Sequence, residues 1–244
     1  MKLDVVFTPA ALASHEVAGR PVFVIDVLRT TTVIVAALFR GARVVVPVAT
    51  VEEATRLVQS LGTDVVTVGE RHGTPIEGFN LDNSPVAMTE ERVRGKTVVM
   101  TTTNGVPALM ATQGASEVYI VAASNLSVAG ERARQLLAER KDLLILCSGR
   151  EGKFALEDAY AAGRLATLAL DGSRRRKGLN DAGLVVVDLA RRYGERWERA
   201  LTRSAAGRHL ILSTRREDLI EATRQDAFPI LPTLRDRRIT VEVS

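Results

Sequence analysis

Short apolar runs alternate with segments of helical apolar spacing along most of the chain. Strand-like runs occur at 4–7, 22–26, 43–47, 65–68, 97–101, 117–121 and 143–147, with a late one at 238–243. Helical spacing occurs at 31–40, 51–61, 104–113, 127–140, 156–171 and 181–201. Short continuous apolar runs are typical of buried strands. The alternation therefore predicts an α/β fold, with a parallel or mostly parallel sheet and helices on both of its faces.

Two of the strand-like runs end in a threonine triplet that precedes a helical segment. Residues 22–32 read VFVIDVLRTTT, and residues 97–105 read TVVMTTTNG. Hydroxyl side chains at such a position cap the helix. The free N–H groups of a first helical turn, together with the positive end of the helix dipole, attract anions. Two such turns predict a site for a doubly charged or extended anion, with phosphate as the first candidate.

The triplets belong to a longer internal similarity. The helix after each triplet is followed by Gly-Ala, at 41–42 and at 114–115, and then by strand, helix and strand. Related loops follow, VGERHG at 68–73 and SGREG at 148–152. The shared site is expected between the two similar units, at the carboxyl ends of their strands. We interpret the chain as two α/β halves, residues 1–95 and residues 96–244, the second of which includes the C-terminal helices and the closing strand.

The stretch 69–95 lacks a clean strand or helix pattern. It is rich in Gly, Asn, Pro and Ser, which favour turns. Long irregular loops in compact domains are usually functional or disordered, and the apolar residues of this one favour an ordered loop that forms part of the site. Asn83 and Ser84, which precede Pro85, are either helix caps or further donors to an anion.

Several acidic residues are candidates for metal binding or catalysis. Asp26 ends a triplet strand, where a carboxylate beside an anion site is explained by a bridging Mg²⁺. The alternative is that Asp26 caps the helix and pairs with Arg29. Glu157 and Asp158 are adjacent, so one of them is expected to face the site, with a solvated helix face as the alternative. Glu70 is a fourth acid, in the loop GERHG.

Cationic and amide side chains occur in the same loops. Arg71 and Arg150 occupy the two related loops and could clamp an anion through bidentate hydrogen bonds, with surface ion pairs as the alternative. Asn104 and Gly105 offer donors and a backbone that a ligand can approach closely. The sequence has neither a G-x-x-x-x-G-K-[ST] nor a G-x-G-x-x-G motif, which disfavours nucleotide loops of those kinds.

Composition narrows the classes of function. The 244 residues are 46% hydrophobic and 25% charged, enough for one large or two small cores. Aromatic residues make up only 4%, which argues against modules that stack nucleic-acid bases. The net charge of +4 includes the basic run 174–177, which we interpret as a solvated loop rather than a nucleic-acid patch.

The cysteine content and the apolar runs bear on the compartment. The single cysteine, Cys147, lies in an apolar run and is expected to be a buried thiol. No apolar run approaches the ~20 residues of a membrane span, and the N-terminus lacks a signal-like segment. We therefore expect a soluble, cytoplasmic protein with no membrane or nucleic-acid partner. Its expected ligand carries a phosphate group, and a homodimer is a possible assembly.

The segments IDVLRTTT, PVATVEEA, GERHGTPIEGFNLDNSP, TTTNG, SN at 124–125 and CSGREGKFALEDAYAAG follow one another along the chain. Together they resemble the 2-phosphosulfolactate phosphatase family, over about residues 1–235. The resemblance implies a three-layer α/β/α fold with an internal duplication. It also implies Mg²⁺-dependent hydrolysis of 2-phospho-3-sulfolactate to sulfolactate and phosphate, in coenzyme M biosynthesis. The matching candidate positions are Asp26, Arg29, Glu70, Asn83, Ser84, 101–103, Asn104, Gly105, Glu157 and Asp158.

The chain departs from the family pattern at three positions. Near Phe79 the family usually reads Gly-Phe-Asp-Leu-Gly-Asn-Ser-Pro, whereas Asn80 and Asp82 stand here at the Asp and second Gly positions. A Ser-x-His-Gly is common near the C-terminus, and Ala206 occupies the His position here. These departures leave the physiological substrate open.

The resulting hypothesis is metal-assisted hydrolysis of a phosphomonoester. Asp26 with either Glu157 or Asp158 holds Mg²⁺, which bridges phosphate oxygens. Glu70 orients or deprotonates the attacking water. The phosphate is expected to contact Thr30, Thr31, Thr32, Thr102, Thr103 and Asn104. A second acidic group is expected to contact Arg29 with Arg71 or Arg150.

Two alternatives remain open. Asp26 could be a nucleophile, although the second Asp of the D-x-D-x-[TV] motif of aspartyl-phosphate-forming phosphatases is missing after it. The protein could also bind a phosphorylated small metabolite without catalysis, as a sensor.

Overall fold

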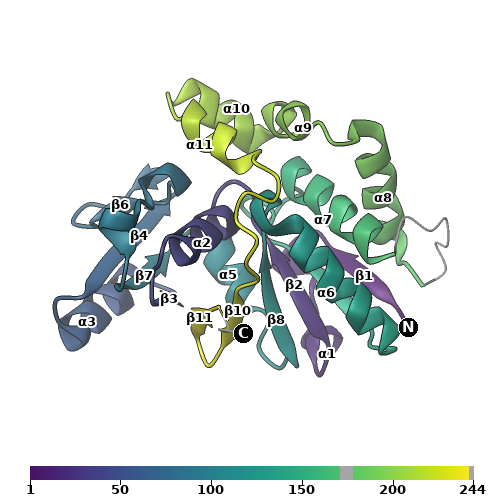
Figure 1. The fold of residues 1–244 in the computed structure, drawn as a ribbon, viewed down its shortest axis with the longest axis horizontal. Helices are drawn as coiled ribbons and strands as arrows, with labels where there is room; N and C mark the ends of the chain where they lie inside the picture. Colours follow the sequence, from purple (N-terminus) through teal and green to yellow (C-terminus); the bar gives the residue numbers. More distant parts are fainter. Residues whose placement is uncertain (171–177, 242–244) are drawn as a thin grey trace.

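An eleven-stranded sheet lies between two layers of helices in the computed structural model of the chain, which describes residues 1–170 and 178–241 (Figure 1). The strands are β1 (Leu3–Val6), β2 (Pro21–Ile25), β3 (Val44–Pro47), β4 (Val65–Arg71), β5 (Thr74–Pro75), β6 (Leu81–Asp82), β7 (Thr97–Thr101), β8 (Glu117–Val121), β9 (Leu143–Cys147), β10 (Thr233–Arg235) and β11 (Arg238–Thr240). The α-helices are α1 (Ser14–Val17), α2 (Thr30–Phe39), α3 (Val51–Leu61), α4 (Glu90–Val93), α5 (Gly105–Met110), α6 (Leu126–Ala138), α7 (Leu156–Ala169), α8 (Asp181–Tyr193), α9 (Trp197–Arg203), α10 (Ala205–Leu212) and α11 (Arg216–Ala222).

None of the helices within these residues is long and apolar enough to cross a membrane. The expected three-layer α/β/α fold is confirmed.

Two parallel blocks of strands share this sheet. The strand order is β1-β9-β2-β8-β10-β11-β3-β7-β4-β5, and β6 pairs with β4. Strands β1, β9, β2 and β8 are mutually parallel, as are β3, β7, β4 and β6. The hairpin β10–β11 joins the blocks through antiparallel pairs, with Thr233 opposite Tyr119 and Ile239 opposite Val45. The sheet is therefore mostly parallel and continuous.

Strands from residues 1–95 and from residues 96–244 alternate in the sheet. Strand β2 lies between β8 and β9, and β7 lies between β3 and β4. Each parallel block thus contains strands from both ranges. An internal duplication with its boundary at residue 95 stays a prediction.

The central strands are buried on both faces. Phe23 and Ile25 of β2 pack in a core with α6, α7 and α8, whereas Val22 and Val24 pack on the opposite face with α2 and α5. This alternation follows from the two-residue period of a strand. In the other block, Val99 of β7 packs against α3. Helix α2 is buried along nearly its whole length, as expected for a helix enclosed by other elements.

The structure differs from the sequence-based expectation mainly after residue 180. The segment 181–201 forms two helices, because Gly194 ends α8 with a positive φ of 60° before α9 begins. Helices α10 and α11 and strand β10 are additional to the expected elements. The segments that lie partly or wholly outside the described residues are the ends of the expected helix 156–171 and strand 238–243, and the basic run 174–177.

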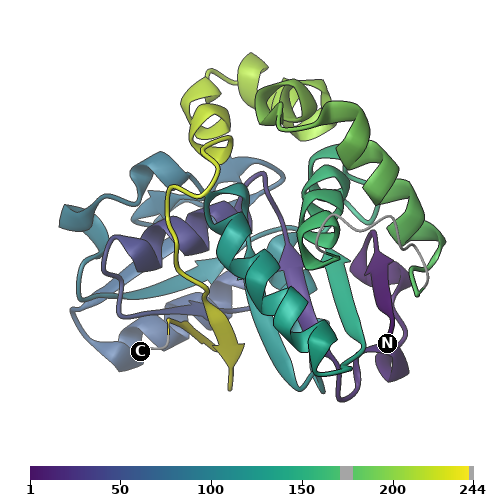
Figure 2. The same ribbon diagram turned by 45° about the vertical axis from the view of Figure 1, so that its right-hand side comes forward.

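Helices α8 to α11 form an arch over one end of the sheet (Figures 1 and 2). After α11 the chain runs across the molecule between α2 and α6 to reach β10 (Figure 2). The backbone N–H of Phe228 donates to Ser124 O (2.8 Å) along this path, and the Phe228 ring stacks on Phe39. The C-terminal part of the chain is thereby tied both to the sheet and to the end that carries the arch.

Candidate active site

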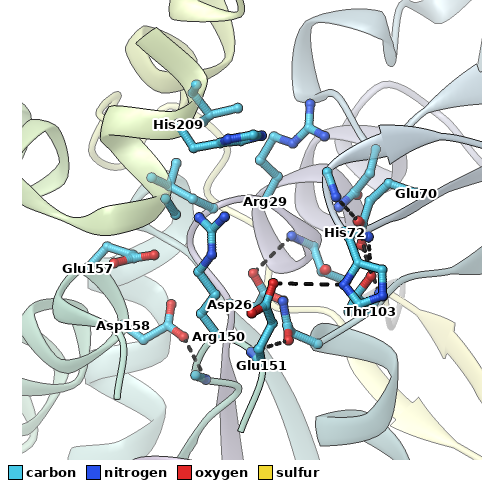
Figure 3. Close-up of a pocket in the computed structure, with 18 of the residues that line it drawn as sticks. Asp26, Arg29, Glu70, His72, Thr103, Arg150, Glu151, Glu157, Asp158 and His209 are labelled. Carbon is cyan, nitrogen blue, oxygen red and sulfur yellow. Dashed lines mark hydrogen bonds and ion pairs between the residues drawn. The ribbon is translucent and has the colours of Figure 1, made fainter. Parts of the chain in front are cut away.

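A cavity of about 60 Å³ lies at the carboxyl ends of β2, β4, β7 and β9, with α10 above it (Figure 3). Its walls come from the loops that follow these strands, the first turn of α7 and the inner side of α10. The carboxyl ends of strands from both parallel blocks therefore meet at one site. The lining residues with polar side chains are Asp26, Arg29, Thr30, Glu70, His72, Asn83, Thr103, Asn104, Arg150, Glu151, Glu157, Asp158, His209 and Arg215.

The turn between β2 and α2 places Asp26 and Thr30 at the cavity. The backbone N–H of Thr30 donates to Asp26 Oδ1 (3.3 Å). The hydroxyl of Thr31 donates to Asp26 O (2.8 Å), and that of Thr32 donates to Val27 O (2.7 Å). Thr31 and Thr32 thus satisfy the backbone at the end of β2. Thr30 is the member of this triplet that lines the cavity.

The second threonine turn touches the first. The hydroxyls of Thr30 and Thr102 are hydrogen-bonded at 3.2 Å, and Thr102 Oγ1 also accepts the N–H of Val106 in the first turn of α5. Gly105 lies where the turns meet. A Cβ at this position would come within 2.5 Å of Asp26 Oδ2 and 2.4 Å of Thr30 Oγ1. The close approach of the two turns therefore requires glycine at position 105.

Glu70 ties the loop after β4 to the second threonine turn. Its Oε1 accepts the N–H of Thr103 (2.7 Å), and its Oε2 accepts the N–H of Gly73 (2.6 Å) and the hydroxyl of Thr103 (3.1 Å). Both carboxylate oxygens are thus engaged, which favours the positioning of Thr103 and Gly73 over the expected role of orienting or deprotonating the attacking water. Asn104 lines the cavity next to Thr103, and its Oδ1 accepts the N–H of Glu151 (2.8 Å).

The two related loops meet at the edge of the cavity. His72 Nδ1 lies 3.8 Å from Glu151 Oε1, and both side chains are largely exposed. Both residues have a positive φ, 50° for His72 and 51° for Glu151. The N–H of His72 also donates to Thr103 Oγ1 (2.8 Å). The loops that resemble each other in sequence therefore lie on either side of the second threonine turn.

Asp158 holds the ends of two neighbouring strands together. Its Oδ1 accepts the N–H of Val27 (2.9 Å), just after β2. Its Oδ2 accepts the hydroxyl of Ser148 (3.0 Å) and the N–H of Gly149 (3.1 Å), just after β9. Glu157 precedes it in α7 and also lines the cavity. Figure 3 shows Glu157 and Asp158 on one side of the cavity and Glu70 on the other, with Asp26 between them.

Ionisation of Asp26, Glu157 and Asp158 is disfavoured. The pKa of Asp26 is raised to about 6 by burial and by the charges of Glu70 and Glu157, against hydrogen bonds from Thr30. Burial raises the pKa of Glu157. Burial and the charges of Asp26 and Glu157 place the pKa of Asp158 well above its usual range. Buried carboxylates that repel one another create a site at which a cation is favourable.

The donor set fits a metal that is shared with a ligand. Among the described residues, no three His, Cys, Asp or Glu side chains form a group that could hold a metal by themselves. Mg²⁺ usually takes one or two protein carboxylates and completes its shell with waters and phosphate oxygens. Asp26 and Glu157 meet that requirement, because both are buried and both line the cavity. Asp158 is less suited, since both of its oxygens already accept hydrogen bonds from the chain.

The three arginines expected at the site have different surroundings. Arg29 lines the cavity but pairs with Asp82 (3.2 Å) and Asp218 (2.5 Å). Arg71 lies away from the cavity lining and donates to Thr101 Oγ1 and to the carbonyl of Glu70.

Arg150 is the expected arginine whose charge is available to a ligand. Its guanidinium lines the cavity and makes no hydrogen bond or ion pair within the part of the chain that the structure describes. The charge of Arg150 acts on Glu157 across the cavity.

Of the two neighbours Asn83 and Ser84, only Asn83 lines the cavity. Asn83 is 3% exposed and lines the cavity, and its Oδ1 has no hydrogen-bond partner in residues 1–170 and 178–241. Such an orphaned amide is unusual in a native interior and indicates a ligand contact. Ser84 instead donates its hydroxyl to Asp218 Oδ1 (2.5 Å).

The positions that depart from the family pattern have clear structural roles. Asn80 Oδ1 accepts the N–H and the hydroxyl of Thr67 in β4, both at 2.9 Å. Asp82 pairs with Arg29 as described above. Ala206 lies in the cavity wall, and His209 lines the cavity one helical turn later in α10.

His209 and Arg215 are cavity residues that the sequence reasoning missed. Both lie in or next to helices outside the expected elements, and neither belongs to a recognised motif. The apolar spacing of residues 205–212 indicates one more helix after α9, and this helix carries His209.

The chain is similar to proteins of one enzyme family over nearly its whole length. The family described as 2-phosphosulpholactate phosphatase matches residues 6–237. A protein of Symbiobacterium thermophilum named a probable 2-phosphosulfolactate phosphatase is 37% identical over 229 residues, which are 93% of this chain and 97% of that protein. Proteins with the same name from Caldanaerobacter subterraneus subsp. tengcongensis and Clostridium acetobutylicum are 41% and 37% identical, over 68% and 72% of this chain and 68% and 73% of their own lengths. Since the family match includes every loop that forms the cavity, the chain belongs to the 2-phosphosulfolactate phosphatase family.

Proposed function

We propose that the protein is a Mg²⁺-dependent phosphomonoester hydrolase whose substrate is a small organic acid phosphate. The observation that carries the proposal is the cavity in which two threonine turns meet the buried carboxylates of Asp26 and Glu157. The names of the relatives support 2-phospho-3-sulfolactate as the substrate, with sulfolactate and phosphate as products.

The phosphoryl group is bound by the two threonine turns. Thr30 lies at the start of α2, whose open N–H groups and dipole favour an anion. Thr103 and Asn104 face the same cavity from the second turn. Fixed donors of this kind stabilise the charge that spreads over the phosphoryl oxygens in the transition state.

Asp26 and Glu157 are the residues that would hold Mg²⁺. When bound, the ion compensates the charge of the phosphate oxygens and lowers the pKa of a coordinated water. Thr30 fixes the carboxylate of Asp26 through its N–H, and Asp158 holds the ends of β2 and β9 at the required separation. Glu70 fixes Thr103 on the other side.

Arg150 and Asn83 recognise the second acidic group of the substrate. The Arg150 guanidinium makes no hydrogen bond or ion pair with a described residue, and the Asn83 amide oxygen is buried without a partner among them. A carboxylate or sulfonate therefore gains a charge-assisted hydrogen bond from Arg150. Asn83 contributes its amide N–H₂ to the same group when the amide is turned by 180°, which exchanges the positions of its oxygen and nitrogen.

His209 supplies the proton for the leaving alcohol. It lines the cavity from α10, on the side opposite to the strand ends that carry Asp26. An imidazole ring N–H can donate a proton to an oxygen that it contacts. As the P–O ester bond breaks, the imidazolium N–H passes its proton to the alcohol oxygen, and solvent then reprotonates the neutral imidazole.

Phosphate release from a small panel of esters tests the proposal. We expect turnover of 2-phospho-3-sulfolactate and 2-phospholactate in Mg²⁺, slower turnover of glycerol 2-phosphate, which lacks the second acid, and loss of activity in EDTA. Asp26→Asn should remain folded and lose activity. Binding of 2-phospho-3-sulfolactate without phosphate release, with Mg²⁺ or any other divalent metal, would instead identify a non-catalytic binder.

A further inference from the structure

A buried ion network connects three elements of the cavity wall. Arg29 Nη1 lies 2.5 Å from Asp218 Oδ2 and 3.2 Å from Asp82 Oδ2. Asp218 Oδ1 accepts the hydroxyl of Ser84 (2.5 Å). Asp82 also pairs with Arg215 (3.3 Å). The two arginines and the two aspartates balance in charge, which is what a buried group of ions requires.

The Arg29–Asp218 pair at the centre of the network is well shielded from solvent, whereas the side chains of Asp82 and Arg215 are 18% and 25% exposed. Arg29 is 5% exposed and Asp218 is 2% exposed. Both oxygens of Asp218 are engaged, one by a guanidinium and one by a hydroxyl. In such surroundings a hydrogen bond to an ionised group holds its partners more tightly than it would at the surface. The positions of Arg29 and Ser84 are therefore coupled through Asp218.

The network includes two residues of the cavity lining, Arg29 and Arg215, and its other members lie close to the lining in the sequence. Arg29 immediately precedes Thr30, whose N–H holds the carboxylate of Asp26. Ser84 follows Asn83, the residue with the orphaned amide oxygen. Asp218 lies in α11, shortly after Arg215, which lines the cavity and donates to Gly73 O (2.7 Å).

We infer that Asp218 is a positioning residue of the active site, an inference that rests on the proposed function. It acts through Arg29 on the turn that carries Asp26 and Thr30, and through Ser84 on Asn83. Because Asp218 lies in α11, it also fixes the position of this helix relative to the turn and to Asn83. Arg29 accordingly serves as a connection between elements and not as a direct grip on the substrate.

Asp218→Asn tests this inference in the full-length protein. Loss of the charge leaves Arg29 buried beside a single aspartate, and the turn at Thr30 shifts. We expect kcat for 2-phospho-3-sulfolactate to fall by about 100-fold, the loss that a displacement on the order of 1 Å causes at reacting groups. Inorganic phosphate, used as an inhibitor, should bind more weakly because the donors at Thr30 move with the turn.

Glu221→Gln is the matched control on the same helix. Glu221 is 9% exposed and pairs with Arg40 (2.9 Å) and Arg224 (3.0 Å), and neither of these arginines lines the cavity. Its loss weakens the attachment of α11 without acting on Arg29. We expect kcat and the phosphate inhibition constant of this variant to stay within about 3-fold of wild type, because the partners of Glu221 do not contact residues of the cavity.

Ser84→Ala keeps the test decisive if Asp218→Asn does not fold. It removes one hydrogen bond to Asp218 and leaves every charge in place. We expect kcat to fall by about 10-fold from the loss of one hydrogen bond to an ionised group. The effects of Ser84→Ala and Asp218→Asn should be non-additive in the double variant, because both act on one network.

The outcomes separate this inference from the proposed function. Absence of turnover in the wild-type protein would overturn the proposed function itself. Wild-type turnover together with equal kcat values for Asp218→Asn and Glu221→Gln would overturn the positioning role of Asp218 alone. Unchanged kcat in Ser84→Ala would also overturn it, since the hydroxyl contact to Asp218 would then have no effect on the site.

Discussion

Asp26 carries its carboxylate where ionisation is disfavoured. Burial and the neighbouring acids raise its pKa from 3.8 to about 6. An acid with a higher pKa in the folded than in the unfolded protein binds more protons when folded. Stability therefore falls as the pH rises from 3.8 to about 6, and stays lower above that range. Such a conflict between charge and burial is common at sites where function requires the charge.

Asp26→Asn is therefore expected to be more stable than wild type in EDTA at pH 7.5. The gain should be on the order of 3 kcal/mol, from roughly two pKa units at about 1.4 kcal/mol each. Because wild-type Asp26 is protonated at low pH, the difference should shrink as the pH is lowered through 6 toward 4. Urea unfolding at several pH values measures it. A difference that is independent of pH, or a less stable variant, would contradict the assigned environment of Asp26.

Arg150→Gln should weaken recognition of the second acidic group. The expected effect is a rise in KM of about 10- to 100-fold for 2-phospho-3-sulfolactate, from the loss of a charge-assisted hydrogen bond worth about 1.5–3 kcal/mol. The KM for glycerol 2-phosphate, which has no second acid, should change little. Lys153→Gln, an exposed cation of the same loop, is the control and should leave both constants unchanged. A parallel rise in KM for both esters would place Arg150 at the phosphate instead.

His209→Gln should slow the hydrolysis of esters whose leaving group needs a proton more than the hydrolysis of esters whose leaving group does not. Alkyl phosphates need a proton on the departing oxygen, and loss of a general acid costs about 10²- to 10⁴-fold. The p-nitrophenolate ion leaves without a proton, so kcat for p-nitrophenyl phosphate should be nearly unaffected. His15→Gln, in the distant helix α1, serves as the control. Equal losses for both kinds of ester would show that His209 is not the proton donor.

At the scale of elements, the central strands and the two threonine turns were predictable from the sequence. Buried strands produce continuous apolar runs, and the hydroxyls that follow them mark the helix starts. Which hydroxyl faces a ligand could not be predicted, because successive residues at a helix start point about 100° apart. In the structure the hydroxyls of Thr31 and Thr32 donate to backbone carbonyls, and Thr30 lines the cavity.

The surroundings of Arg29 could not be predicted for a different reason. Its partners Asp82 and Asp218 lie 53 and 189 residues away along the chain. Only the fold brings them together, and α11, which carries Asp218, has no motif of its own. The local sequence places Arg29 beside the predicted anion site and therefore predicts a contact with the substrate. The same limit applies to His209 in α10.

Gly105→Ala should separate the two threonine turns. The new Cβ would meet the side chains of Thr30 and Asp26 at about 2.5 Å, so one turn has to move. We expect kcat per folded molecule to fall by about 100-fold, as for other displacements of reacting groups. Gly130→Ala is the matched variant, because its Cβ meets Leu168 between α6 and α7, at 2.7 Å, far from the cavity. Gly130→Ala should lower thermal stability and leave kcat unchanged, and an equally active Gly105→Ala would rule out the required close approach.

At the scale of the whole molecule, the sheet makes the two stretches of sequence interdependent. Strands β1 and β2 pair with β9, and β3 and β4 pair with β7. Within residues 1–95, the described strand pairs are those of β4 with the two-residue strands β5 and β6. The hairpin β10–β11 then connects the two parallel blocks. The longer strands of residues 1–95 therefore take most of their hydrogen-bonded neighbours from residues 96–244.

Residues 1–95 expressed alone should accordingly fail to fold, because each of their longer strands lacks its neighbour and exposes both an edge and an apolar face. The full chain should unfold in one cooperative transition. Fluorescence of Trp197, in the arch above the cavity, and far-UV circular dichroism, which follows all the helices, should give the same midpoint in urea. Dispersed NMR signals from the fragment, or two separate transitions in the full chain, would show that the first half is an independent domain. The cavity would then lie at an interface between domains, and its geometry would depend on how they associate.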